Sequence, residues 1–356
     1  MARSKPVVGL DIGSSSIKMI QLKETKRGWA LQNMGVAPLP PEAIVDGALM
    51  NSTAIVDAIQ ELMAAQGVKR GREVATSVSG HSVIIKKISM PVMTRDELEE
   101  SIQWEAEQYI PFDMSEVNID VEILRPEGNE AGQMDVLLVA AKKDMISDYT
   151  SVISEAGLTP VVVDVDAFAV ENAHEIAYGA PPAGETFVLV NVGASVININ
   201  VVSDGMSVFT RDISMGGNQV TEDIQKQLNV SYDEAEALKL GGELGADADS
   251  VVPQEVERVI QQVSEQMAGE IQRSLDFFAA TSADASFSKI FLSGGSAKIP
   301  ALFKAIEQRA GVPVEIMNPF RGIEIDERRF DPNYINEVAP MSAVVVGLGL
   351  RKTAER

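Results

Sequence analysis

Two short segments, 180 positions apart, have the same pattern of residue types. In each, an apolar strand ends in a polar residue (Asp11 or Asn191), a glycine follows two residues later (Gly13 or Gly193), and a second apolar strand comes next. A glycine in such a turn lets backbone N–H groups approach an anion closely. The pattern therefore predicts two phosphate-binding loops that could hold one polyphosphate from both sides. The two segments are Val8–Ile20 (VGLDIGSSSIKMI) and Val188–Asn200 (VLVNVGASVININ).

The composition restricts the class of protein. A length of 356 residues favours about two domains, and 45% hydrophobic residues are enough for sizeable cores. The formal net charge of −22 repels nucleic-acid backbones and anionic lipid surfaces, so we expect neither as a ligand. The absence of cysteine excludes a disulfide framework, and two distant histidines make a zinc site or a serine-type triad improbable. The longest apolar runs are too short to cross a bilayer, so we expect a cytoplasmic protein that does not insert into the membrane.

Strands and helices alternate twice along the chain, as is typical of a duplicated α/β architecture. The alternation predicts two lobes around a cleft, with a small α+β insert in the first lobe. The predicted ranges are 1–79 and 156–180 for the first lobe, 80–155 for the insert, 181–340 for the second lobe and 341–356 for a closing helix that returns to the first lobe.

Two further glycine-rich turns lie in the second half of the chain. One contains Gly216 and Gly217, and the other is LSGGSAKIP at Leu292–Pro300. With the two hairpins, these motifs resemble those of the actin-like ATPase superfamily, which implies an actin-like (actin, Hsp70, FtsA) fold. In that resemblance the hairpins are the two phosphate motifs and Leu292–Pro300 is the adenosine motif.

The resemblance implies an ATP site that contains Mg²⁺. Asp11 would hold the metal ion through water, because Mg²⁺ keeps part of its hydration shell. Glu236 and Lys239 lie three residues apart on one face of a short predicted helix and would reach the ribose and base; the alternative is an ordinary intrahelical ion pair. The other residues that would contact the nucleotide are Gly13, Ser14, Ser15, Lys18, Asn191, Gly193, Ala194, Ser195, Gly216, Gly217, Gly294, Gly295 and Ser296.

One position departs from the superfamily pattern. The second phosphate motif has Asn191 where active ATPases of the superfamily often have Asp, and a neutral amide is a weak partner for Mg²⁺ and a poor proton acceptor. Asp166 lies in the region that orients the attacking water in relatives, so Asp166 and Asp11 are the candidates for hydrolysis. Our hypothesis is tight ATP binding with slow or negligible turnover, in which the nucleotide sets the angle between the lobes.

The insert carries a more specific resemblance. Ser89–Asp113 (SMPVMTRDELEESIQWEAEQYIPFD) and Glu116–Leu124 (EVNIDVEIL) are similar to the PilM family of type IV pilus assembly proteins, as is Val163–Ala173 (VDVDAFAVENA). The family implies a cytoplasmic protein that binds ATP, captures the cytoplasmic N-terminal peptide of PilN, and through it joins other inner-membrane pilus components. It would be recruited to the inner membrane by that partner.

A peptide could add to the edge of a strand in the insert, and Val83–Met90 is the candidate edge; a strand buried in the insert's own sheet is an equal alternative. We interpret Trp104 and Tyr109 as core residues rather than peptide contacts.

Other functions remain as alternatives. A small-molecule kinase of the same fold would need a carboxylate base in a second pocket, which the motifs do not supply. An FtsA-like cell-division protein would carry a C-terminal amphipathic membrane helix, whereas the chain ends in the polar segment Arg351–Arg356. Self-association into filaments stays open.

Overall fold

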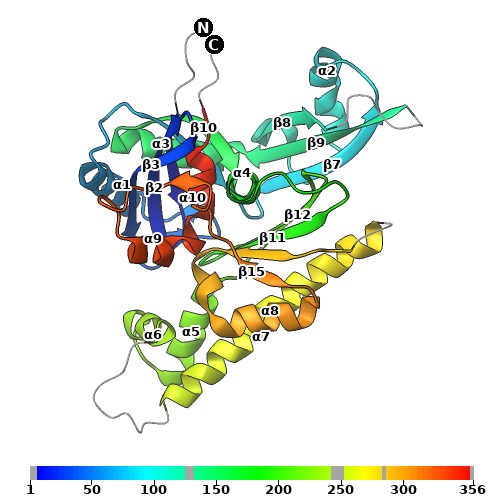
Figure 1. Ribbon diagram of the computed structural model, residues 1–356. Coiled ribbons are helices and arrows are strands. Elements are labelled where there is room, and N and C mark those ends of the chain that lie inside the picture. Colours follow the sequence, from blue (N-terminus) through cyan, green and yellow to red (C-terminus); the bar gives the residue numbers. More distant parts are fainter. Residues whose placement is uncertain (1–5, 125–131, 242–251, 283–285, 353–356) are drawn as a thin grey trace.

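The computed structural model describes residues 6–124, 132–241, 252–282 and 286–352. Parts of four predicted ranges lie outside the described residues: 1–5 of the first lobe, 125–131 of the insert, 242–251 and 283–285 of the second lobe, and 353–356 of the closing segment. Two lobes, each built on one sheet, form the body of the molecule, and a smaller unit projects from the first lobe (Figure 1). The predicted two-lobed α/β fold is therefore confirmed.

The first sheet has the strand order β10-β6-β1-β2-β3-β16. Its central strand β1 is wholly buried, and the apolar residues of α1 and α3 pack on the sheet to form the core of this lobe. Helix α1 begins at the side-chain cap Asn51 and ends at Gly67, which adopts the left-handed conformation that favours glycine. The elements are β1 (Val8–Ile12), β2 (Ser16–Thr25), β3 (Gly28–Pro38), α1 (Ser52–Gln66), β6 (Glu73–Val78), α3 (Lys143–Ala156), β10 (Thr159–Val165) and β16 (Ile323–Glu324); β4 (Ile44–Val45) and β5 (Ala48–Leu49) form a small separate pair.

The second sheet has the order β13-β12-β11-β14-β15. Four helices cover it, and the apolar face of the long helix α7 packs into its core. A capping box of Ser231 and Glu234, a pattern of two residues three apart, starts α6. The elements are β11 (Thr186–Val192), β12 (Ile197–Ser203), β13 (Met206–Ile213), α5 (Gly217–Leu228), α6 (Tyr232–Lys239), α7 (Val252–Thr281), β14 (Ile290–Ser293), α8 (Pro300–Ala310) and β15 (Val314–Ile316).

The insert is a three-stranded antiparallel sheet, β7-β9-β8, with helix α2 on one face. Helix α2 begins at a capping box of Thr94 and Glu97. The interpretation of Trp104 and Tyr109 as core residues is wrong, because Trp104 is 77% exposed and Tyr109 is 41% exposed. The elements are β7 (Val83–Pro91), α2 (Arg95–Ala106), β8 (Val117–Ile123) and β9 (Gln133–Lys142).

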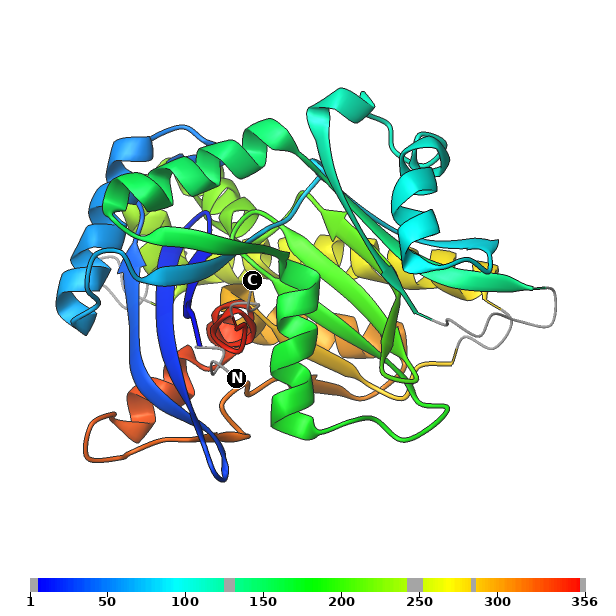
Figure 2. The ribbon, with the colours of Figure 1, turned by 90° about the horizontal axis from the view of Figure 1, so that it is seen from above.

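Two helices connect the lobes, α4 (Asp166–Tyr178) and α10 (Ala343–Gly349), with the short α9 (Pro332–Val338) before the latter. Viewed from above, α10 lies between the strands of the first lobe and α4 (Figure 2). Strand β16 falls within 181–340, the range predicted for the second lobe, yet it pairs with β3 of the first sheet. The chain therefore returns to the first lobe before the closing helix, and Phe320, Ile323 and Ile335 join the core that the lobes share around α4 and α10.

Candidate nucleotide site

The second predicted phosphate loop, residues 193–196, joins β11 to β12 in a tight turn in which the Gly193 N–H donates to the Val196 carbonyl at 2.9 Å. The other glycine motifs of this lobe meet there. The Gly217 N–H donates to the Gly193 carbonyl at 3.0 Å, and the Ser296 hydroxyl donates to the same carbonyl at 3.0 Å. Two further residues of the predicted set, Ala194 and Ser195, accept hydrogen bonds from the backbone N–H and side-chain amide of Asn218, at 2.8 and 3.3 Å.

Glycine is required at two of these contacts because the backbones are so close. A Cβ on Gly216 would lie 2.5 Å from the Ala194 carbonyl oxygen, and one on Gly294 would lie 2.2 Å from the Val192 carbonyl oxygen. Gly294 also has φ +95°, which side chains of L-residues rarely adopt. Its neighbour Gly295 has open space around it. The sequence motifs thus describe one compact set of loops, in which Gly216, Gly217 and Gly294 are buried against neighbouring backbone and Gly295 is exposed.

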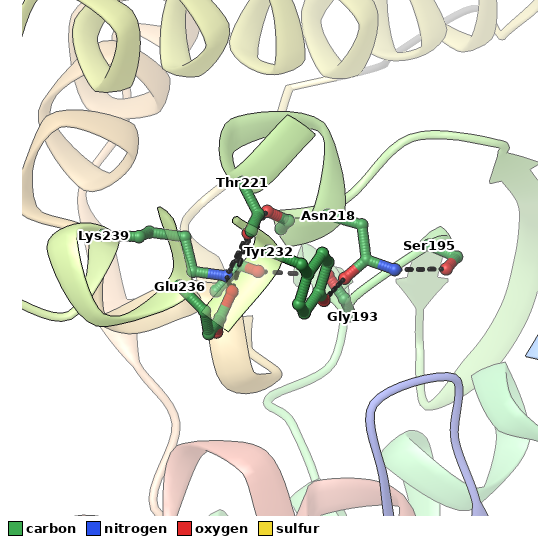
Figure 3. Close-up of polar contacts among 9 residues, drawn as sticks. Gly193, Ser195, Asn218, Thr221, Tyr232, Glu236 and Lys239 are labelled. Carbon is green, nitrogen blue, oxygen red and sulfur yellow. Dashed lines mark hydrogen bonds and ion pairs between the residues drawn. The ribbon is translucent and has the colours of Figure 1, made fainter. Parts of the chain in front are cut away.

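Helix α6 supplies a charged pair beside these loops (Figure 3). The Lys239 ammonium donates to the Glu236 carboxylate at 2.6 Å and to the Thr221 hydroxyl at 3.0 Å, and Thr221 in turn donates to Glu236 at 2.6 Å. Lys239 also reaches the Gly217 carbonyl at 3.4 Å. The predicted pair is therefore an intrahelical ion pair that also contacts the Gly216–Gly217 turn. Both readings of the pair, ion pair and nucleotide contact, are compatible with this geometry.

The first hairpin has the same geometry as the second. The Gly13 N–H donates to the Ser16 carbonyl at 3.2 Å, and Asp11 on β1 lies directly opposite Lys18 on β2. Their side chains form a buried ion pair of 3.0 Å. Ser15 holds the loop in place, because its carbonyl accepts the Leu39 N–H at 2.9 Å; no further contact fixes a role for Ser14.

Asp166, at the start of α4, is partly buried, and the charge of Asp11 in this hairpin acts on its carboxylate. Its carboxylate accepts a hydrogen bond of 2.5 Å from the Ser77 hydroxyl at the end of β6. Burial, assisted by the negative charge of Asp11, raises the pKa of the Asp166 carboxyl to about 6, against the hydrogen bonds of Ser77 and Ser79, which lower it. The charge of Asp212, from the second lobe, raises it further. Carboxylates of both lobes therefore lie close enough to interact across the cleft.

Within the described residues, no group of three histidine or carboxylate side chains could ligate a metal ion directly. A magnesium ion held by Asp11 through water needs no such group, so that expectation stays a prediction. One oxygen of the Asp11 carboxylate already accepts a hydrogen bond from Lys18, so only the other oxygen is free to hold the hydrated ion.

Sequence reasoning missed several polar residues at this site. Asn198 and Asp212 extend a row of hydrogen bonds from Asn191. Asn218 donates to Ser195 of the second phosphate loop, Ser77 donates to Asp166, and Thr221 donates to Glu236. The alternation in β12 was the available signal for Asn198, since a polar residue in an otherwise apolar buried strand needs a hydrogen-bond partner.

The comparisons with known proteins agree with this geometry. The family model described as "Type IV pilus assembly protein PilM" matches residues 9–353. A solved structure described as a PilM–PilN type IV pilus biogenesis complex superposes with a TM-score of 0.86 and 29% identity, over 98% of this chain and 99% of that one. The EutJ ethanolamine utilization protein of Carboxydothermus hydrogenoformans, at 15% identity and a TM-score of 0.57 over 98% of this chain and 90% of that one, shares the fold.

Curated relatives include cell-division proteins named FtsA. The one from Streptococcus pneumoniae is 20% identical over 90% of this chain and 77% of its own length, and the one from Bacillus subtilis is 24% identical over 67% and 58%. No helix within the described ranges is long and apolar enough to cross a membrane. The motifs, the two-lobed fold and the full-length family match together establish that the chain has the actin-like fold and belongs to the PilM family of type IV pilus assembly proteins.

Proposed function

We propose that this protein is an ATP-binding scaffold of the type IV pilus assembly machine and that it binds the N-terminal cytoplasmic peptide of PilN. The observation that carries the proposal is the 29% identity, over 98% of the chain, to a protein solved as a PilM–PilN complex. Through that peptide the protein would be held at the cytoplasmic face of the inner membrane beside other pilus components.

Strand β7 is the element best suited to hold the peptide. It pairs with β9 on one side and forms one edge of the insert sheet. Part of β7 lies close to β13 of the second lobe, and the rest of its unpaired edge could offer backbone groups to an added strand. Val83 and Ile85 lie on the face that packs on the first-lobe core, whereas Ile84 and Ile88 face the core under α2. An extended peptide on this edge would therefore lie between the insert and the first lobe.

The nucleotide would lie between the two hairpins. The close approach of the loops around Gly193, Gly216 and Gly294 supports a phosphate and adenosine site, and Lys18 and Lys239 provide positive charge on the two sides. The amide of Asn191 already accepts from Ser293 at 3.2 Å and donates to Asn198 at 2.9 Å, which leaves little capacity to bind Mg²⁺. We therefore expect ATP to be bound tightly and hydrolysed slowly, with Asp166 as the candidate to orient water.

The test is calorimetric titration of a synthetic PilN N-terminal peptide into the protein, with ATP and Mg²⁺ and without them. Val83 is a poor site for a disrupting variant, because it is 9% exposed and belongs to the first-lobe core. Ile85→Ala trims a partly buried side chain on the edge strand, and we expect it to weaken peptide binding by about tenfold.

The matched control is Ile119→Ala, a partly buried isoleucine on β8 at the opposite edge of the same sheet. It should leave the peptide affinity within about twofold. If the wild-type protein binds no peptide in either nucleotide state, the scaffold function is refuted and a small-molecule kinase becomes the better reading.

A further inference from the structure

One large aromatic side chain of the insert faces solvent. Trp104 lies on helix α2 and is 77% exposed, whereas Leu98, Ile102 and Ala106 of the same helix are buried in the core of the insert. A tryptophan this exposed contributes little to folding, and tryptophan is among the residue types that most often dominate binding at protein interfaces. Helix α2 lies at the outer end of the insert, far from α5 and α6, so a partner protein could reach it (Figure 1).

Two carboxylates flank the indole on the same face of the helix. Glu100 is four residues before Trp104 and Glu107 is three residues after it, so the three side chains are neighbours on the helix surface. Helical geometry continues to Glu107, whose φ is −54° and ψ −30°. Both glutamates are exposed, and within the described ranges neither pairs with a lysine or an arginine. The face therefore combines an exposed aromatic ring with two unpaired negative charges.

The charge of α2 is unfavourable for the helix itself. Six carboxylates and one arginine lie between Arg95 and Glu107. In the first turn negative charge complements the helix dipole, and Glu97 closes the capping box. The last turn has no basic residue, and there Glu105 and Glu107 lie at the negative end of the dipole. Arg95 does not offset them, because it lies at the other end of the helix and pairs with Glu99. A cation from another molecule would therefore stabilise the end of α2.

We propose that the face of α2 formed by Glu100, Trp104 and Glu107 is a second docking surface and that it binds a basic segment of a partner protein. An arginine or lysine of that segment would lie over the indole, because cation–π attraction is strongest for tryptophan, and neighbouring basic side chains would meet the two carboxylates.

Charge selects this occupant over the others. The chain has a net charge of −22, so a second copy would bring mostly like charge to an acidic face, and an anionic lipid surface would be repelled. The surface lies on a helix that covers one face of the insert sheet, whereas the edge proposed for the PilN peptide is strand β7. The inference therefore goes beyond the proposed function and does not depend on it.

The experiment uses Trp104 as its own reporter. The chain has two tryptophans, so Trp29→Phe in the full-length protein leaves Trp104 as the remaining indole. The probe is a short synthetic peptide of alternating arginine and leucine, and its counterpart has glutamate in place of arginine. We expect the arginine peptide to change the fluorescence of Trp104 in a saturable way and the glutamate peptide to leave it unchanged.

Substitutions on the face test which side chains bind. The fluorescence anisotropy of a dye-labelled arginine peptide gives the affinity of each variant. We expect Trp104→Ala to weaken binding by about tenfold or more. The double variant Glu100→Gln, Glu107→Gln should weaken it by about fivefold and reduce its dependence on salt. Circular dichroism checks that each variant is folded.

The matched control removes the same two charges elsewhere. Glu61 on α1 and Glu257 on α7 are exposed glutamates outside the insert. The double variant Glu61→Gln, Glu257→Gln has the same net charge as the double variant on α2, and its affinity should stay within about twofold of the wild type. An equal loss in the two double variants would mean that the peptide follows net charge alone, which overturns the docking surface.

The other outcomes separate this inference from the proposed function. Displacement of the arginine peptide by the PilN peptide would place both at one site and overturn a second surface. Self-association of the wild type that Trp104→Ala abolishes, measured by analytical ultracentrifugation, would make the occupant a second copy and overturn the basic partner. Wild-type protein that binds the arginine peptide at this face but no PilN peptide supports the docking surface and refutes the scaffold function.

Discussion

At the scale of single residues, Asp166 is one of the carboxyl groups whose pKa the structure raises toward neutral pH. Its pKa is raised to about 6, chiefly by burial and then by the charge of Asp11. The folded state therefore holds this proton more tightly than the unfolded chain does. The resulting stability is present below the unfolded pKa near 3.8 and is lost as the pH rises through about 6.

We predict that Asp166→Asn removes this pH dependence. Between about pH 5 and about pH 7.5 the unfolding free energy of the wild type should fall by about 1.4 kcal/mol relative to the variant, because only the wild type must ionise a buried carboxyl. Urea unfolding of both proteins at the two pH values measures the difference. If the difference in unfolding free energy between the wild type and Asp166→Asn is the same at both pH values, the pKa of Asp166 is not raised in the folded state.

A second prediction at this scale concerns two neighbouring glycines. Gly294→Ala should weaken the affinity for an ATP analogue by about tenfold or more, because the new Cβ would lie 2.2 Å from the Val192 carbonyl oxygen and because φ is +95°. Gly295→Ala is the control, since nothing lies within 4 Å of its Cβ position. Titration with a fluorescent nucleotide measures the affinity of both variants. If the two substitutions weaken that affinity equally, the adenosine does not lie at this turn.

At the scale of elements, helix α2 shows where the sequence pattern was misread. The buried face is formed by Leu98, Ile102 and Ala106, which are four residues apart, and Trp104 lies on the opposite side of the helix. Hydrophobicity alone assigned Trp104 to the core, whereas strict helical spacing would have placed it outside. The apolar character of Trp104 was given more weight than its position in the helical repeat of 3.6 residues.

We therefore predict that Trp104→Ala changes the unfolding free energy by less than about 1 kcal/mol, while Leu98→Ala, at 1% exposure, costs about 2–5 kcal/mol. Chemical denaturation followed by circular dichroism tests both. A large loss from Trp104→Ala would show that the indole is packed in solution.

Other elements were predictable for local reasons. The two hairpins, both capping boxes and the glycine ends of α1 and α3 follow from short-range rules, and the structure has all of them. The pairing of β16 with β3, and the hydrogen bond from the Gly80 N–H to Asp212, join residues more than one hundred positions apart, and no local pattern specifies such partners. The glycine motifs of the second lobe could be found because close backbone approach requires glycine. Asn198 was marked only as a polar residue in a buried apolar strand, and nothing in the sequence marked its partner Asp212.

At the scale of the whole molecule, the two lobes are held in register by the crossing of α4 and α10. At the crossing, Gly347 of α10 is so close to α4 that a Cβ would lie 1.8 Å from the Ala169 carbonyl oxygen. Every other residue of α10 is buried as well, so the helix has no free side to which it could shift. Because α10 also packs on β1 and β2 of the first sheet and α4 contacts β11 and β12 of the second, this crossing lies between the two lobes.

We predict that Gly347→Ala lowers the unfolding free energy by about 3 kcal/mol or more, since the added methyl must push the connecting helices apart. The control is Gly269→Ala in the middle of α7, where the nearest atom is a flexible arginine nitrogen 4.0 Å away; there alanine should raise stability by up to about 1 kcal/mol through helix propensity. If Gly→Ala lowers the unfolding free energy in α10 and raises it in α7, the loss in α10 comes from the close contact with α4 and not from helix propensity. Thermal and urea unfolding give both values, and a Gly347→Ala variant as stable as the wild type would show that the lobes can part at this point without cost.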